Sequence, residues 1–109
     1  MPTLLQRIAS ARAARREALR LETRARLREA LRELLPGQRV IVFGSLTHPN
    51  HFREDSDVDI ALESEPAGLS LFGLIGELEE RVARPVDVAV LARCRFRDKI
   101  RKEGEEWMN

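Results

Sequence analysis

The sequence lacks several features that would place a protein in a membrane or outside the cell. It has one cysteine, Cys94, so no disulfide can form within the chain, and this agrees with a reducing compartment. No stretch approaches the ~20 apolar residues that are needed to span a bilayer. The first residues also lack the apolar core of a signal peptide. We therefore expect a cytoplasmic protein with no membrane segment, in which Cys94 is a structural or surface thiol.

An excess of charge of one sign is also missing. The net charge is +1, so bulk electrostatics do not indicate a nucleic-acid partner. The charge is nevertheless uneven, because residues 1–35 hold nine arginines and four glutamates, which leaves a negative balance in residues 36–109. Residues 1–35 contain no aromatic side chain on which a base could stack. A nucleic-acid contact is therefore the least favoured role of this segment.

The length and composition predict one domain in two parts. A chain of 109 residues with 43% hydrophobic content can bury roughly two thirds of the surface of its unfolded form. Residues 1–35 form the first part, in which residues 3–35 are expected to be a single long helix because they contain no internal glycine or proline. Pro36 and Gly37 end this helix, and residues 36–109 form the core.

The two halves of this helix have different patterns. The second half is amphipathic and is expected to pack on a sheet. The first half has only a thin seam, in which Leu4, Ala11, Ala18 and Ala25 recur every seven residues. Three interpretations remain open for it: a solvated extension, a helix that binds a partner or a second copy of the chain, and a nucleic-acid contact through its arginines.

The stretch from Arg39 to Ala61 contains the most informative pattern. Val40–Phe43 is a short apolar run, rich in β-branched residues and stopped by Gly44, which is typical of a buried strand. Gly44 allows a turn and the close approach of a ligand, and Ser45 adds a hydroxyl where free N–H groups are expected. This corner is a candidate phosphate-binding site.

Two carboxylates follow the corner. In the expected strand 57–62, alternate side chains share a face, so Asp57 and Asp59 project the same way. Two neighbouring carboxylates repel each other unless solvent or a cation separates them. Their oxygens suit a magnesium ion that also carries substrate phosphates.

Three more elements are expected after this strand: a helix at 69–82, a strand at 86–91 and a closing helix at 95–108. Asp87 lies inside the third strand, where an aspartate is disfavoured and needs a partner. It is either an edge-strand residue that faces water or an arginine, or a third carboxylate of the site. Phe96, Ile100 and Trp107 are expected to pack the closing helix on the core, and Gly104 is a point at which that helix can break.

The pattern FGS, a spacer and DSDVD resembles the signature of the DNA polymerase beta-like nucleotidyltransferases. The chain length resembles the minimal members of that superfamily, which are often the antitoxin partners of HEPN-domain toxins, and the resemblance covers Leu27 to Met108. It implies an α+β fold of two layers, with helices on a small mixed sheet of three or more strands in the order α-β-α-β-α-β-α. The third carboxylate of the family maps onto Asp87.

The resemblance also implies an activity. Asp57, Asp59 and Asp87 would hold two Mg²⁺ ions, and Gly44 and Ser45 would bind the phosphates of ATP. The reaction would move AMP onto a tyrosine of a HEPN toxin. Two alternatives stay open: an antitoxin that only masks its toxin by binding, and a stand-alone transferase that acts on a small molecule or RNA.

The spacer departs from the family pattern. It has eleven residues between Ser45 and Asp57 instead of ten, and it contains no glycine. His48 and His51 within it are too few for a zinc site on their own, so they are expected to line the nucleotide pocket or to face water. Arg53 is a candidate contact for the triphosphate. The extra residue lengthens the loop and leaves Asp57 and Asp59 as the pair that matches the family pattern.

Overall fold

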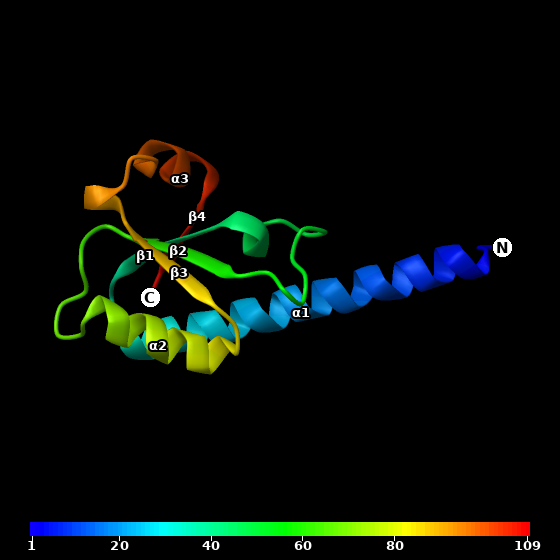
Figure 1. Cartoon of the computed structure of the whole chain (residues 1–109), viewed down its shortest axis with the longest axis horizontal. Helices are drawn as coiled ribbons and strands as arrows, with labels where there is room; N and C mark the ends of the chain where they lie inside the picture. The colour runs from blue at the N-terminus through cyan, green and yellow to red at the C-terminus, as the bar shows by residue number, and fades with distance from the viewer.

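A four-stranded sheet lies at the centre of the computed structural model, which describes residues 1–109 (Figure 1). Its strands are β1 (Arg39–Phe43), β2 (Val58–Leu62), β3 (Val86–Val90) and β4 (Glu105–Met108), in the order β3-β2-β1-β4. β1 pairs antiparallel with both β2 and β4, whereas β2 and β3 are parallel. The sheet is therefore mixed, and β3 and β4 are its two edges.

One face of the sheet carries the main hydrophobic core. Two helices cover this face, α1 (Leu4–Leu34) and α2 (Leu71–Val82) (Figure 1). The side chains that pack there come from alternate positions of each strand, as the two-residue period of a strand requires. The strand residues of this core are Val40, Val42, Val58, Ile60, Leu62, Val86 and Trp107.

The opposite face is covered only in part. The short helix α3 (Arg97–Glu103) places Ile100 against Ile41, Ala61 and Leu91, and Cys94 packs at the edge of this small cluster. The aspartates of β2 and β3 occupy the same alternation as Ala61 on this second face. The α+β fold with two layers and a mixed sheet is thus confirmed, and it leaves the aspartates on the less covered side.

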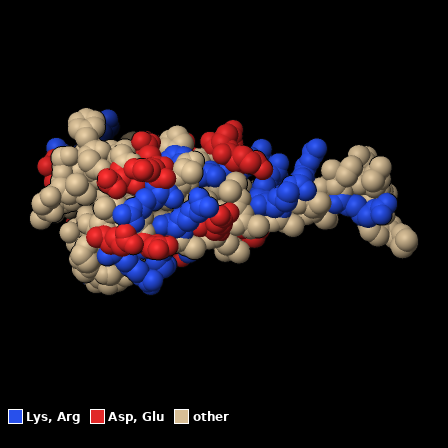
Figure 2. Space-filling model, turned by 90° about the horizontal axis from the view of Figure 1, so that it is seen from below, with Lys and Arg blue, Asp and Glu red and all other residues tan.

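The expected long helix is confirmed as α1, a continuous helix of 31 residues. Thr3 is its N-cap, and the side chains of Thr3 and Gln6 form a capping box. Residues 1–15 are all exposed, whereas the second half packs through Leu27 and Leu31. The N-terminal half therefore projects beyond the sheet, and it carries basic but no acidic side chains up to Arg16 (Figure 2).

The prediction of one closing helix at 95–108 is wrong. α3 ends at Glu103, and the chain continues as β4, which pairs with β1. Gly104 makes this change of direction possible, because a Cβ at this position would overlap the side chain of Ile41 and the carbonyl of Ile100. Burial of Trp107, which is 2% exposed, stabilises the strand conformation.

The other boundaries differ by one or two residues from those expected. Ser70 caps α2 by accepting a hydrogen bond from the Gly73 N–H at 3.0 Å, so this helix begins at Leu71. The segment after β1 is a short 3₁₀ turn, η1 (Gly44–Thr47), instead of a longer helix. None of the helices is both long enough and apolar enough to cross a membrane.

Candidate active site

The corner at the end of β1 depends on a glycine. Gly44 has a φ of +75°, in the left-handed region that other residues rarely adopt. A Cβ at this position would also overlap the Oδ2 atom of Asp59. The Thr47 hydroxyl donates a hydrogen bond to the Gly44 carbonyl at 2.8 Å and closes the turn. The backbone of Gly44 and the carboxylate of Asp59 are therefore in direct contact, which the order of residues along the chain only suggested.

Three aspartates lie near this corner. Asp57 ends the loop before β2, Asp59 lies within β2, and Asp87 lies within β3. The parallel pairing sets Asp59 directly beside Asp87, and the antiparallel pairing sets it opposite Phe43. Because side chains alternate along a strand, Asp59 and Asp87 project on the face that α3 covers only in part, and the charge of Asp57 acts on Asp59 from the adjoining loop. The structure thus brings together the residues that the sequence predicted as one group.

The electrostatics of the group are unfavourable in the free protein. Burial, the charges of Asp87 and Asp57 and a hydrogen bond with Asp87 together raise the pKa of Asp59 from 3.8 to about 6, and burial is the largest of these causes. Asp57 and Asp87 themselves are exposed. All the charges that shift the pKa of Asp59 are negative, so the repulsion has no cationic partner within the chain.

A hard cation suits this set of donors. Carboxylate oxygens are preferred ligands of Mg²⁺, which usually takes only one or two carboxylates from a protein and completes its shell with water and phosphate. No three His, Cys, Asp or Glu side chains form a ready coordination cluster in the free chain. The aspartates would therefore supply part of a coordination shell, and a phosphate-bearing substrate would supply the remainder.

Helix α1 contacts the corner through hydrogen bonds from two of its arginines. The Nη1 atom of Arg20 donates a hydrogen bond to the Leu46 carbonyl of η1 at 3.0 Å, and Arg24 approaches the same oxygen at 3.4 Å. Arg20 is 9% exposed and also pairs with Glu17 through two hydrogen bonds of 2.9 and 2.7 Å. Arg20 and Arg24 therefore fix η1, although the sequence alone did not identify either of them as part of the site.

Arg24 connects the same turn to the last strand. Its guanidinium donates two hydrogen bonds to Glu105, at 2.7 and 2.8 Å, and lies 5.2 Å from the ring centroid of Trp107. The hydrogen bond from Arg24 lowers the pKa of Glu105. α1, η1 and β4 are thus joined at one point.

The eleven-residue spacer is anchored near its C-terminal end. Phe52 is buried in the main core, and the guanidinium of Arg84 lies 4.5 Å from its ring centroid. Arg84 also donates hydrogen bonds to the carbonyls of Arg53 at 3.2 Å and Ser56 at 2.8 Å. Burial lowers the pKa of Arg84, and the charge of Asp57 opposes this shift. These contacts hold the loop directly before Asp57.

The two histidines of the spacer lie side by side on the surface. Their ring centroids are 5.4 Å apart, and both residues are exposed. No third metal-binding side chain completes a cluster with them. His48 borders a cleft that begins at the corner, whereas Arg53 has an exposed side chain and uses its backbone to hold the loop.

A cleft of about 430 Å³ opens between η1 and α3. Its walls are formed by the end of β1, the corner and the surface of α3. The residues that line it are Phe43, Gly44, His48, Phe96, Lys99, Ile100 and Glu103. Since Phe43 is the strand partner of Asp59, the cleft lies next to the carboxylates. The sequence offered no signal for this cleft, because its two sides lie about fifty positions apart.

Comparisons with known proteins agree with this geometry. No curated protein sequence matches the chain. A chain in a crystal structure of a toxin–antitoxin with AMP-PNP is similar in fold, with a TM-score of 0.59 and 22% sequence identity, and the match covers 78% of this chain and 73% of that one. The family model that describes the nucleotidyltransferase domain matches residues 24–108, which include the corner, the three aspartates and β4. Because this match spans most of its length, the chain belongs to the nucleotidyltransferase domain family.

Proposed function

We propose that this chain is a Mg²⁺-dependent adenylyltransferase that moves AMP from ATP onto a hydroxyl of a partner protein. One observation carries the proposal: in a member of the nucleotidyltransferase family, Asp59 and Asp87 share one face of the sheet beside the Gly44 corner, and the charge of Asp57 acts on them from the adjoining loop. The uncompensated charge of these carboxylates supports a cationic cofactor.

The residues divide into two groups by role. Asp57, Asp59 and Asp87 would hold Mg²⁺, for which we propose two ions. Gly44, which has no side chain to block a ligand, and the hydroxyl of Ser45 would bind the β and γ phosphates of ATP. When bound, the metal would neutralise phosphate charge and make the acceptor hydroxyl more acidic.

The reaction needs no nucleophile from this chain. The acceptor oxygen forms a bond to the α-phosphorus, the bond from that phosphorus to the pyrophosphate oxygen breaks, and the hydroxyl proton passes to the exposed carboxylate of Asp87. The residues of the chain act by position and charge, which supply most of the rate enhancement in phosphoryl transfer.

The partner is proposed to be a HEPN-domain toxin, with a tyrosine as the acceptor and with this chain as the cytoplasmic antitoxin. The similar fold in a toxin–antitoxin structure that contains AMP-PNP supports both the class of partner and the nucleotide. The exposed N-terminal half of α1 offers a surface for such a partner or for a second copy of this chain.

A transfer assay tests the proposal. The purified chain is incubated with ATP, Mg²⁺ and the protein encoded by the neighbouring gene, and intact masses are measured. We expect an AMP-sized increase on the partner, and we expect Asp59→Asn to reduce its rate by about 10²-fold or more. Asp98→Asn, which changes an exposed aspartate of α3, is the matched control and should leave the rate unchanged. Unmodified partner with the unaltered chain would contradict the proposal.

The longer spacer favours a second candidate function, in which the chain masks its toxin by binding without transfer. Inhibition of the toxin by Asp59→Asn, at undiminished strength and with no AMP transferred, would establish masking. Transfer to a small molecule or RNA in the absence of any partner protein would instead establish a stand-alone transferase.

A further inference from the structure

The cleft between η1 and α3 is the hollow that touches the corner. Of the five hollows on the surface, the other four include neither Gly44 nor Ser45 in their linings. A nucleotide whose phosphates bind at the corner keeps its nucleoside within a few bond lengths. The nucleoside must therefore lie on the open surface nearby or enter this cleft.

The lining of the cleft has the chemistry of a nucleoside site. Phe43, Phe96 and Ile100 supply apolar surface, Lys99 supplies a cation, and Glu103 supplies a hydrogen-bond acceptor. The volume of about 430 Å³ lies within the range of small-molecule pockets. Ligand sites of this kind combine apolar walls with a few polar groups.

No packing contact within the hydrophobic clusters of the chain accounts for the position of Phe96. Its side chain is 64% exposed although it borders a cleft, and it lies outside both hydrophobic clusters. An aromatic ring that is exposed at the rim of a pocket is suited to stacking on a planar base. Lys99 lies three positions further along, in α3, whose N-cap is Phe96, and it makes no ion pair with an acidic side chain of this chain.

We propose that this cleft binds the nucleoside of the ATP substrate, with the base stacked on Phe96 and Lys99 contacting the phosphates. The inference rests on the proposed function, because it assumes that phosphates bind at Gly44 and Ser45. It assigns the choice of nucleotide to α3, a helix that carries none of the aspartates of the site.

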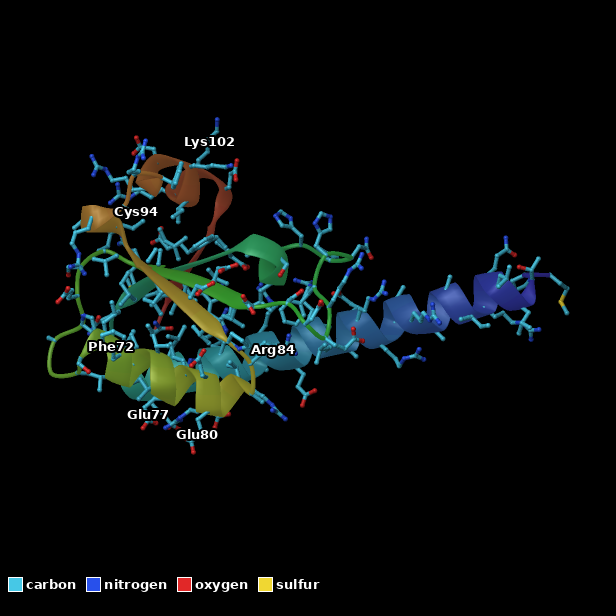
Figure 3. The ribbon with its side chains drawn as sticks, in the orientation of Figure 1. Phe72, Glu77, Glu80, Arg84, Cys94 and Lys102 are labelled. Carbon is cyan, nitrogen blue, oxygen red and sulfur yellow. The ribbon has the colours of Figure 1, made fainter.

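Binding measurements without any partner protein test the inference. Calorimetry compares AMP-PNP with inorganic tripolyphosphate, both with Mg²⁺. Phe96→Ala should weaken AMP-PNP roughly ten-fold, which is the loss expected for one base–aromatic stack, and leave tripolyphosphate unchanged. Phe72→Ala is the matched control, because Phe72 is 89% exposed and lies on α2, away from α3 (Figure 3).

The two lysines of the chain form a second matched pair. Lys99→Ala should weaken both ligands several-fold, because it removes a phosphate contact. Lys102→Ala should weaken neither, because Lys102 lies on the same helix but points away from the sheet (Figure 3). Thermal melting of each variant confirms that the fold is retained.

The outcomes separate this inference from the proposed function. If the unaltered chain binds AMP-PNP and Phe96→Ala binds it equally well, the cleft is not the nucleoside site. If tripolyphosphate binds as tightly as AMP-PNP, the nucleoside makes no contact and the inference also fails. If the unaltered chain binds neither ligand, the proposed function itself is overturned.

Discussion

Replacing Asp59 with asparagine should stabilise the metal-free protein, although Asp59 is one of the proposed metal ligands. Asparagine keeps the shape of the side chain and removes the charge that Asp57 and Asp87 repel. The pKa of Asp59 rises from 3.8 to about 6, and this shift corresponds to at most about 3 kcal/mol of destabilisation of the charged form. Asp59 is only half-buried, so solvent screening reduces the expected gain to about 1–2 kcal/mol.

The dependence on pH identifies the cause. The pKa of Asp59 is higher in the folded protein than in the unfolded chain. Between pH 3.8 and about pH 6 the folded protein therefore keeps a proton that the unfolded chain has released. The stability of the unaltered protein therefore falls as the pH rises through this window, and the destabilisation is complete above it. The advantage of Asp59→Asn should be full at about pH 7.5 and should largely disappear by about pH 4.

Urea unfolding and thermal melting in the presence of a chelator, at several pH values, measure this difference. The melting temperature of Asp59→Asn near neutral pH should exceed that of the unaltered protein by roughly 5 °C or more. Asp98→Asn should cause no change, and added Mg²⁺ should reduce the difference because a cation relieves the repulsion in the unaltered protein. An Asp59→Asn variant that is no more stable, or whose gain does not vary with pH, would refute this account of the site.

Three further changes probe the supports of the site. Gly44→Ala should destabilise the fold by about 1–3 kcal/mol in urea unfolding and should abolish binding of AMP-PNP, because the new side chain is strained at a positive φ and overlaps Asp59. Unchanged binding would contradict the geometry described for the corner. Arg20→Gln should lower the free energy of unfolding by about 1–3 kcal/mol, because the hydrogen bond from Arg20 to η1 is lost. Arg26→Gln, which breaks an exposed ion pair of the same helix, should lower it by less than about 1 kcal/mol. Equal losses in the two variants would argue against the anchoring role of Arg20. Removal of residues 1–14, which are all exposed, should change the melting temperature by no more than ~2 °C, and a large loss would mean that this segment contributes to the stability of the core.

Local patterns were sufficient to predict the parts of the chain that carry the carboxylates. Val40–Phe43 is a β-branched run stopped by a glycine, and the alternation along β2 sets Asp59 on the face of Ala61 whatever surrounds them, with Asp57 just before the strand. The position of Asp87 beside Asp59 depends on the register of two parallel strands, which the sequence pattern alone does not determine. That part of the prediction came from the family resemblance.

Contacts between distant residues account for what sequence reasoning missed. Glu105 to Met108 continue a helix-favouring segment, and only pairing with β1 and burial of Trp107 make them a strand. Arg20 meets Leu46 across 26 positions, and Arg84 meets Ser56 across 28. Because almost every basic residue of this chain is an arginine, composition cannot distinguish those that hold a loop from those that face water.

The location of Asp87 at the edge of the sheet has a consequence for the solubility of the protein. β3 has the sequence VDVAV and pairs with β2 on one side only, so its other side presents unpaired backbone groups. A charged residue within an apolar edge strand discourages other chains from adding to it. Asp87→Ala would leave an uninterrupted apolar strand at this edge and would favour aggregation, whereas Asp87→Asn keeps a polar side chain there. The same carboxylate is therefore expected to discourage the addition of a strand from another chain at β3.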